Sequence, residues 1–236
     1  MGAGNVAYQG TTKVTAANAL ALDSNCWRQV PEGSEKHSWL LVVFSIMVIS
    51  LFNGGTPPMQ LSKFGYYGDF FIYPVLIAAF TLCAIFETTG LQFGEWLLFS
   101  LSGVAAWTVA EYVLHRMVFH NFPFIKQMHD AHHTAPKALV GSPTWLSVAI
   151  GSIVVFAPLW WASGFMIASA ITTGLMIGYL CYVTVHHLNH HGNPRHSTYL
   201  YWAKRRHALH HYCGETKNFG IITDFWDRLL GTEYPH

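Results

Sequence analysis

Charged residues are scarce in this sequence, and their scarcity sets the class of protein. Asp, Glu, Lys and Arg make up 11 % of the 236 residues, well below the quarter that is usual in soluble domains. Apolar residues reach 52 %, and the mean hydropathy is +0.28. A formal net charge of +1 gives no reason to expect a nucleic-acid partner. The composition therefore indicates a protein that is partly solvated by lipid.

Paired cysteines and a secretion leader are also missing. The four cysteines lie far apart without a CxxC pair, which excludes a disulfide framework and a thiolate zinc site, so we expect free, buried thiols. Residues 1–37 show no basic segment followed by an apolar core, and a cleaved signal peptide is therefore not expected. We interpret residues 1–37 as an N-terminal tail and residues 38–236 as one membrane domain.

Apolar runs, in contrast, recur along the sequence. A first run, residues 39–52, would span roughly 21 Å as a helix, against a hydrocarbon core of about 30 Å. It leaves the number of transmembrane helices open between four and five. A tight turn at residues 162–164 separates the last two runs. The four runs that we expect to cross the membrane are residues 70–86, 96–114, 145–161 and 165–185.

Basic residues indicate which side of the membrane the histidines occupy. Nine of the thirteen Lys and Arg residues lie in or beside the two histidine-rich regions. The positive-inside rule then places these regions on the cytoplasmic face. We expect an all-α integral membrane protein with a cytosolic helical cap, in the endoplasmic reticulum of a eukaryote or the inner membrane of a bacterium.

Thirteen of the fifteen histidines lie between residues 115 and 133 or between 186 and 211. An HxxHH pattern occurs twice, and its spacings of three and four bring the rings to one helix face. His186 and His190 form an i,i+4 pair. His115 and His120 are five residues apart, so we expect His120 to follow the frayed end of a helix. The ten candidate metal ligands are His115, His120, His129, His132, His133, His186, His190, His207, His210 and His211.

Ten imidazoles exceed what one ion accepts, and the pattern therefore predicts a di-metal site in the cap. Imidazole suits zinc, iron, copper and nickel. Structural zinc takes four ligands, and oxygen chemistry suits a lipid-facing position, so two iron ions are expected, with zinc as a substitute in purified protein. The other histidines are expected to be solvated or hydrogen-bonded; they are His37, His187, His191, His196 and His236.

These motifs resemble the histidine boxes of the fatty acid hydroxylase/sterol desaturase superfamily. The similar segments are residues 111–120, 129–133, 186–194 and 207–212, together with the ending at residues 218–232. The likeness is closest to fatty acid 2-hydroxylases. It implies a membrane-bound di-iron monooxygenase that uses O2 to hydroxylate an acyl chain of a membrane lipid. The cytochrome b5 motif HPGG, which some members carry in a fused domain, does not occur in these residues. Electrons are therefore expected from an external cytochrome b5, or from ferredoxin with its reductase.

Four polar residues are candidates for orienting the histidine rings: Glu111, Asp130, Asn218 and Asp224. For Asp224, a role as a helix cap is an equally good interpretation. The basic run at residues 204–206 is interpreted as a solvated or headgroup-facing surface, with contact to an acidic electron donor as the alternative.

Other functions stay open at this point. A sterol, a carotenoid or another lipid could be the substrate, and desaturation could replace hydroxylation, because one oxidant performs both reactions. A histidine-rich metal-binding or transport protein is the alternative from another class. Transport would need polar or ionisable residues at the middle of the spans, and residues 145–161 and 165–185 contain Ser and Thr but no charged residue. A zinc-dependent lipid hydrolase would work without a reductant.

Overall fold

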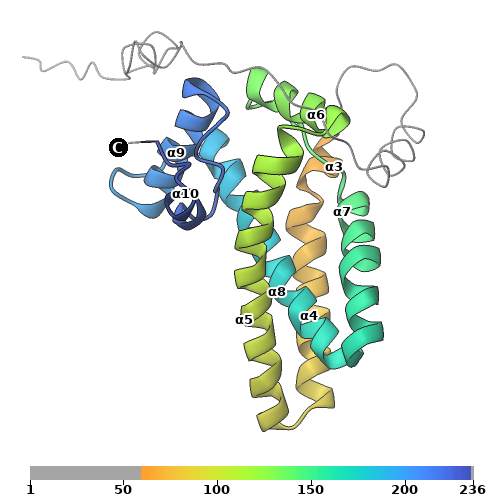
Figure 1. Ribbon diagram of the computed structural model, residues 1–236. Helices are drawn as coiled ribbons and strands as arrows, with labels where there is room; N and C mark the ends of the chain where they lie inside the picture. The colour runs from red at the N-terminus through yellow and green to blue at the C-terminus, as the bar shows by residue number, and fades with distance from the viewer. Residues whose placement is uncertain (1–59, 235–236) are drawn as a thin grey trace, which may run out of the picture. The chain divides into compact units, whose positions relative to one another are not determined.

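The computed structural model describes residues 60–234, which form helices with one isolated antiparallel bridge, between Gln60 and Val140. Figure 1 shows the long helices side by side, with the short ones gathered towards one end. The first half of these residues forms α3 (Lys63–Tyr67), α4 (Asp69–Glu87), α5 (Gly90–Val113), the π-helical turn η1 (Leu114–Phe119) and α6 (Pro123–Thr134). The second half forms α7 (Thr144–Ile150), the π-helical turn η2 (Gly151–Phe156), α8 (Ala157–His191), α9 (Tyr199–Cys213) and α10 (Phe225–Leu229).

Local signals explain where several helices begin. The Ser62 hydroxyl accepts the amide of Gly65 at 3.1 Å and caps α3. Thr89 and Gln92 form a capping box at the start of α5. Pro123 occupies the first position of α6, where its missing N–H costs nothing. The cap on α6 fixes the start of a helix that carries three of the candidate ligands, and the cap on α5 fixes the helix that continues into His115.

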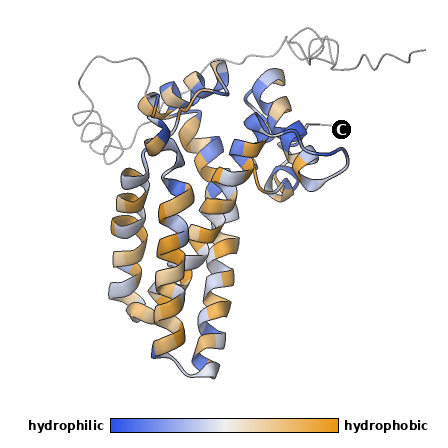
Figure 2. Ribbon diagram, turned by 180° about the vertical axis from the view of Figure 1, so that it is seen from behind, coloured by the Kyte–Doolittle hydropathy of each residue, from blue (hydrophilic) through white to orange (hydrophobic). Residues whose placement is uncertain are grey.

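Three helical segments within residues 60–234 are long and apolar enough to span a membrane: Lys63–Glu87, Gly90–Phe119 and Thr144–His191. The 48-residue third segment bends at Gly164, whose φ of 82° and ψ of 166° are not helical. Figure 2 shows that apolar residues predominate along the long helices and polar residues at the end that carries α6 and α9.

The all-α architecture and the turn at residues 162–164 are thus confirmed. The number of membrane crossings stays a prediction. Residues 1–37 and the run at residues 39–52 lie outside the described part of the protein.

Glycines allow α5 and α8 to pack backbone against backbone. A Cβ atom added to Gly103 would collide with the carbonyl oxygen of Ile171, and one added to Gly174 would collide with the carbonyl oxygen of Ser100. Where lipid surrounds a helix pair, such close approach supplies the van der Waals contact that holds the pair together. This contact fixes the two helices whose ends carry His115 and His186.

Two of the described cysteines have free thiols, as expected, but these two thiols are not buried. Cys83 and Cys181 are exposed on α4 and α8, and Cys213 is partly exposed. The prediction of burial is therefore wrong for Cys83 and Cys181. A thiol behaves as a small apolar group, so a lipid-facing helix surface tolerates it as well as a protein core does.

Replacing Gly174 with alanine should loosen the α5–α8 pair. We expect a loss of about 1–3 kcal/mol, the usual effect of overpacking, measured as a lower unfolding temperature of the detergent-purified protein. Gly94→Ala on α5 is the matched control, since its Cβ would meet nothing within 4 Å. The control should be neutral or slightly stabilising. Equal unfolding temperatures for the two variants would contradict the close contact.

Candidate metal centre

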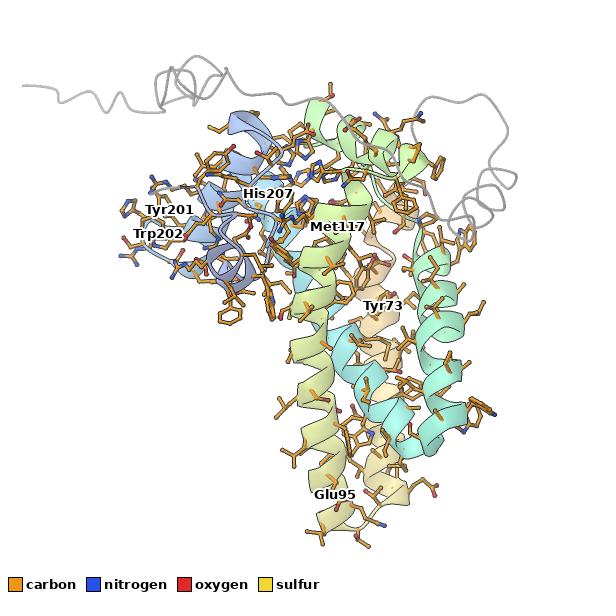
Figure 3. The ribbon with its side chains drawn as sticks, in the orientation of Figure 1. Tyr73, Glu95, Met117, Tyr201, Trp202 and His207 are labelled. Atoms are coloured by element: carbon orange, nitrogen blue, oxygen red, sulfur yellow. The ribbon has the colours of Figure 1, made fainter. Side chains whose placement is uncertain are left out.

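The ten histidines chosen from their spacing come together in two groups of five. Within each group, the five candidate ligand nitrogens all lie within 4.8 Å of one another. Figure 3 shows nitrogen-bearing side chains gathered near His207, at the end of the long helices opposite to Glu95. The first group consists of His115, His120, His129, His133 and His210. The second group consists of His132, His186, His190, His207 and His211.

Each HxxHH motif divides its rings between the two groups. On α6, the i,i+4 pair His129 and His133 belongs to the first group, and His132 belongs to the second. On α9 the division is reversed, since His210 joins the first group while its neighbours join the second. The groups adjoin, because the rings of His133 and His211 stack with centroids 4.1 Å apart. The site is therefore one cluster with two centres.

A π-helical turn explains the five-residue spacing of His115 and His120. α5 does not fray after His115; it continues as η1 to Phe119, and His120 follows directly. One turn of a π-helix spans between four and five residues, so positions i and i+5 return to the same side. The two rings accordingly stack at a centroid distance of 5.2 Å. The expectation that the helix frays here is wrong.

Backbone carbonyls fix the tautomers of two rings in the first group. His115 Nδ1 lies 2.6 Å from the carbonyl oxygen of Phe219, and His210 Nδ1 lies 2.8 Å from that of Lys217. A carbonyl only accepts, so each Nδ1 carries the proton and donates it. In a neutral ring, Nε2 then presents its lone pair to the centre of the group.

Burial keeps the rings neutral. Loss of solvent lowers the pKa of His132 to about 4 and that of His210 to about 4. The pKa of His207 also falls well below its usual range, first because of burial and then because of the neighbouring histidines. At neutral pH these rings are therefore ready to act as ligands.

Distances between the nitrogens fit a shared cation. Neighbouring Nε2 atoms lie 3.0 Å apart in the pair His129 and His133 and 3.0 Å apart in the pair His207 and His211. Donors placed about 2.1 Å from one ion at right angles would be separated by about 3 Å. Converging lone pairs repel one another unless a proton or a cation lies between them. The donor set therefore fits two transition-metal ions.

Glu215, which the sequence did not single out, contacts two rings of the first group from outside. Its carboxylate oxygens lie 3.3 Å from His120 Nδ1 and 3.7 Å from His133 Nδ1. Gly214, with a φ of 126°, turns the backbone between α9 and Glu215. A carboxylate behind a ligating imidazole favours the Nδ1–H tautomer and makes Nε2 a stronger donor.

Glu111, one of the four predicted orienting residues, contacts no ring of the two groups through a hydrogen bond. Its carboxylate instead accepts hydrogen bonds from backbone amides of the loop that contains Phe219. The Ile222 amide donates to its carboxylate at 2.9 Å, and the Ile221 amide donates to the same oxygen. These amides lie two and three residues after Phe219, whose carbonyl accepts the hydrogen bond from His115 Nδ1. Only 3 % of Glu111 is exposed, so the two amides are what make its burial tolerable.

The other three predicted orienting residues have partners elsewhere. Lys126 pairs with Asp130 at 2.7 Å. Asn218 donates to the carbonyl of Arg206 and accepts the amide of Tyr234. Asp224 occupies the N-cap position of α10, but its side chain makes no cap hydrogen bond and instead pairs with Arg228 at 2.7 Å.

Histidines outside the ten make different contacts. His187 lies 3.1 Å from the Tyr66 hydroxyl, and His191 stacks on His187 at 4.5 Å. His196 lies 2.7 Å from the Ser197 hydroxyl. His37 and His236 lie outside the described residues. None of the three described rings belongs to either group of five.

The basic run at residues 204–206 is not a uniform surface. Arg206 is buried and lies 3.7 Å from Asp224, so the interpretation of the run as solvated is wrong for this residue. Lys204 donates to the carbonyl of Gly192 at 2.7 Å. Arg205 is exposed and lies over the ring of Trp202.

Comparison with known proteins identifies the family. Residues 100–232 match the fatty acid hydroxylase family. Because this match covers more than half of the sequence, the protein belongs to the fatty acid hydroxylase family.

Characterised relatives are similar over part of their length. The fatty acid 2-hydroxylase of Rattus norvegicus is 33 % identical over 147 residues, which are 56 % of this protein and 38 % of the rat protein. The dihydroceramide fatty acyl 2-hydroxylase FAH2 of Arabidopsis thaliana is 32 % identical over 164 residues, 63 % of this protein and 66 % of the plant protein. The sequence thus spans less than half of the rat relative and about two thirds of the plant one.

A solved structure shares the fold. It is titled "Full length scs7p (only hydroxylase domain visible)", and it aligns with a TM-score of 0.63 at 23 % sequence identity. The alignment covers 72 % of this protein and 67 % of the other.

Single histidine replacements should remove one ion at a time. We expect His129→Ala to empty the first group and His132→Ala the second, each lowering the metal content of the purified protein by about half. Elemental mass spectrometry measures this ratio, and His196→Ala, outside both groups, should keep the full content. If His129→Ala and His132→Ala both retained the wild-type content, neither group would be a metal centre.

Replacing Glu215 with glutamine should weaken the first centre alone. The amide keeps the shape but loses the charge behind His120 and His133, and we expect metal affinity to fall on the order of 10-fold. A chelator competition that resolves two binding steps would measure this loss, with Glu95→Gln, at the far end of α5, as the matched control. A loss shared equally by both steps, or no loss, would contradict the assignment.

Proposed function

We propose that this protein is a membrane lipid hydroxylase that inserts one oxygen atom of O2 into a C–H bond of a lipid acyl group at a histidine-ligated di-iron centre. The observation that carries the proposal is the convergence of ten imidazole nitrogens in two groups at one end of three apolar helical segments. The names of the relatives, fatty acid and ceramide hydroxylases, supply the reaction class.

The choice of iron follows from the reaction. Zinc has no redox chemistry, whereas hydroxylation of an alkyl group consumes two electrons in addition to O2. When bound, a pair of iron ions would supply the reductive activation of O2 that C–H hydroxylation requires.

The protein's own residues would hold and orient this centre. Phe219 and Lys217 accept the outer protons of His115 and His210 through their carbonyls, and Glu215 lies behind two further rings. No side chain needs to act as an acid or base on the carbon that reacts. The protein supplies ligand orientation and exclusion of water, which burial of the cluster provides.

The substrate that we propose is the fatty acyl group of a ceramide-like lipid, hydroxylated at carbon 2. The relatives include a dihydroceramide fatty acyl 2-hydroxylase and a ceramide very long chain fatty acid hydroxylase. A cluster at the end of membrane-spanning helices suits a carbon close to the headgroup, because that carbon lies at the same boundary. We place the cluster on the cytoplasmic side, where an external cytochrome b5 or ferredoxin would reach it.

Metal transport is the less favoured function. A transport path would need ligands along the spans. All ten histidines in the two groups instead lie in η1, α6, α9 and the last two turns of α8, or next to these elements.

Isotopically labelled dioxygen tests the reaction. Iron-loaded protein in lipid, supplied with a reductant and a ceramide, should give a 2-hydroxylated product that carries the label, detected by mass spectrometry of extracted lipids. His129→Ala and His132→Ala should abolish the product, and His196→Ala should not. Label-free product, or activity under strict anaerobiosis, would show a hydrolase or another reaction.

A further inference from the structure

The short helix α10 of the cap exposes large apolar side chains that the metal centre does not use. Phe225, Leu229 and Leu230 are 55 %, 62 % and 52 % exposed. The opposite side of the helix carries Asp227, which is 1 % exposed and accepts the amides of Phe219 and Gly220 at 2.9 and 2.7 Å. α10 therefore has one face fixed in the cap and one apolar face open.

Two hydrogen bonds hold this part of the protein against α5. The Trp226 indole donates to the hydroxyl of Thr108 at 3.1 Å. The hydroxyls of Tyr112 and Thr232 lie 2.9 Å apart. Figure 1 shows α10 beside α5 rather than level with α6. The depth of Thr108 along α5 is therefore the depth of α10.

Helix geometry places Thr108 inside the hydrocarbon layer. Eighteen residues separate it from Gly90, the first residue of α5, and at 1.5 Å per residue they span about 27 Å. A layer of about 30 Å that began at Gly90 would end about two residues beyond Thr108. If Glu95 lay in the headgroup region instead, the layer would shift towards the cap and Thr108 would lie deeper.

Charges near α10 are compatible with this boundary. Arg228 is the exposed basic residue of the helix, and it pairs with Asp224 at 2.7 Å and with Glu233 at 3.4 Å. A paired arginine with a long stem can extend towards the headgroups while its neighbours face the lipid acyl groups. In water, by contrast, three large apolar side chains on one short helix and its C-cap would form an unfavourable patch.

We propose that α10 is a membrane anchor whose open face, formed by Phe225, Leu229 and Leu230, lies in the lipid boundary beside α5. The occupant of this face is the bilayer itself, since α10 is held beside an apolar helix that is long enough to span the membrane, at the depth of Thr108. The membrane contact of α10 does not depend on the reaction or on the identity of the metal. A test of this contact is therefore separate from a test of the proposed function.

Fluorescence quenching in lipid tests the anchor. A bimane label is attached to Leu229→Cys in full-length protein whose four native cysteines are serine, reconstituted in phosphatidylcholine with or without bromine near the start of the acyl groups. We expect brominated lipid to quench the label at least as strongly as a label at Leu101→Cys on α5, where Leu101 is 65 % exposed and, about 16 Å from Gly90, lies nearer the middle of the layer. Aqueous iodide should quench neither label efficiently.

A label at the exposed Gln127→Cys of α6 is the aqueous control and should respond to iodide but not to brominated lipid. If the Leu229 label behaves like the Gln127 label, α10 lies in water and the proposal is wrong. If neither quencher reaches it, protein covers the face, and the proposal is wrong as well. A label at Phe225→Cys repeats the measurement, and wild-type metal content shows that each labelled protein is folded.

Discussion

Ten imidazoles, four buried and six half-buried, turn their Nε2 atoms towards two common centres, and this convergence is the constraint on which the rest of the structure depends. Burial lowers the pKa of rings such as His132 and His210, so protons do not neutralise the converging lone pairs at neutral pH. Without a cation, the arrangement would be electrostatically unfavourable. The surrounding structure must therefore hold rings that repel one another. It does so with hydrogen bonds that Nδ1 of His115 and His210 donates to backbone carbonyls, and with the close packing of α5 against α8.

The two centres are built in nearly the same way from different segments. Each takes a pair from the end of a long helix, two rings from one HxxHH motif and one ring from the other. The pair from α8 needs only ordinary helical spacing, four residues apart. The pair from α5 is five residues apart and needs the π-helical turn η1. The HxxHH motifs of α6 and α9 each give rings to both centres, which makes the centres adjacent. Neither centre can therefore form without the two motifs that the other centre also uses.

Much of the fold and the membership of the cluster could be predicted from the sequence, because both leave periodic or compositional traces. Apolar runs mark α4, α5 and α8, and Gly164 marks the bend. The division of the histidines could not be predicted, since rings at i, i+3 and i+4 share a helix face whether they serve one ion or two. The groups that contact the outer side of the rings could not be predicted from the sequence either. A backbone carbonyl such as that of Phe219 is present in every residue type, and the position of Glu215 depends on the turn at Gly214.

The C-terminal segment connects the membrane boundary with the orientation of a candidate ligand. Trp226 fixes α10 to Thr108, Asp227 of the same helix holds the amides of Phe219 and Gly220, and the Phe219 carbonyl receives the proton of His115. Glu111 holds the next two amides from the α5 side. The loop is thus clamped between α5 and α10, so a shift of α10 relative to α5 would reach His115 through only two hydrogen bonds. Such a short path would suit the proposed lipid hydroxylase, in which the same boundary would position both the lipid substrate and the ligands.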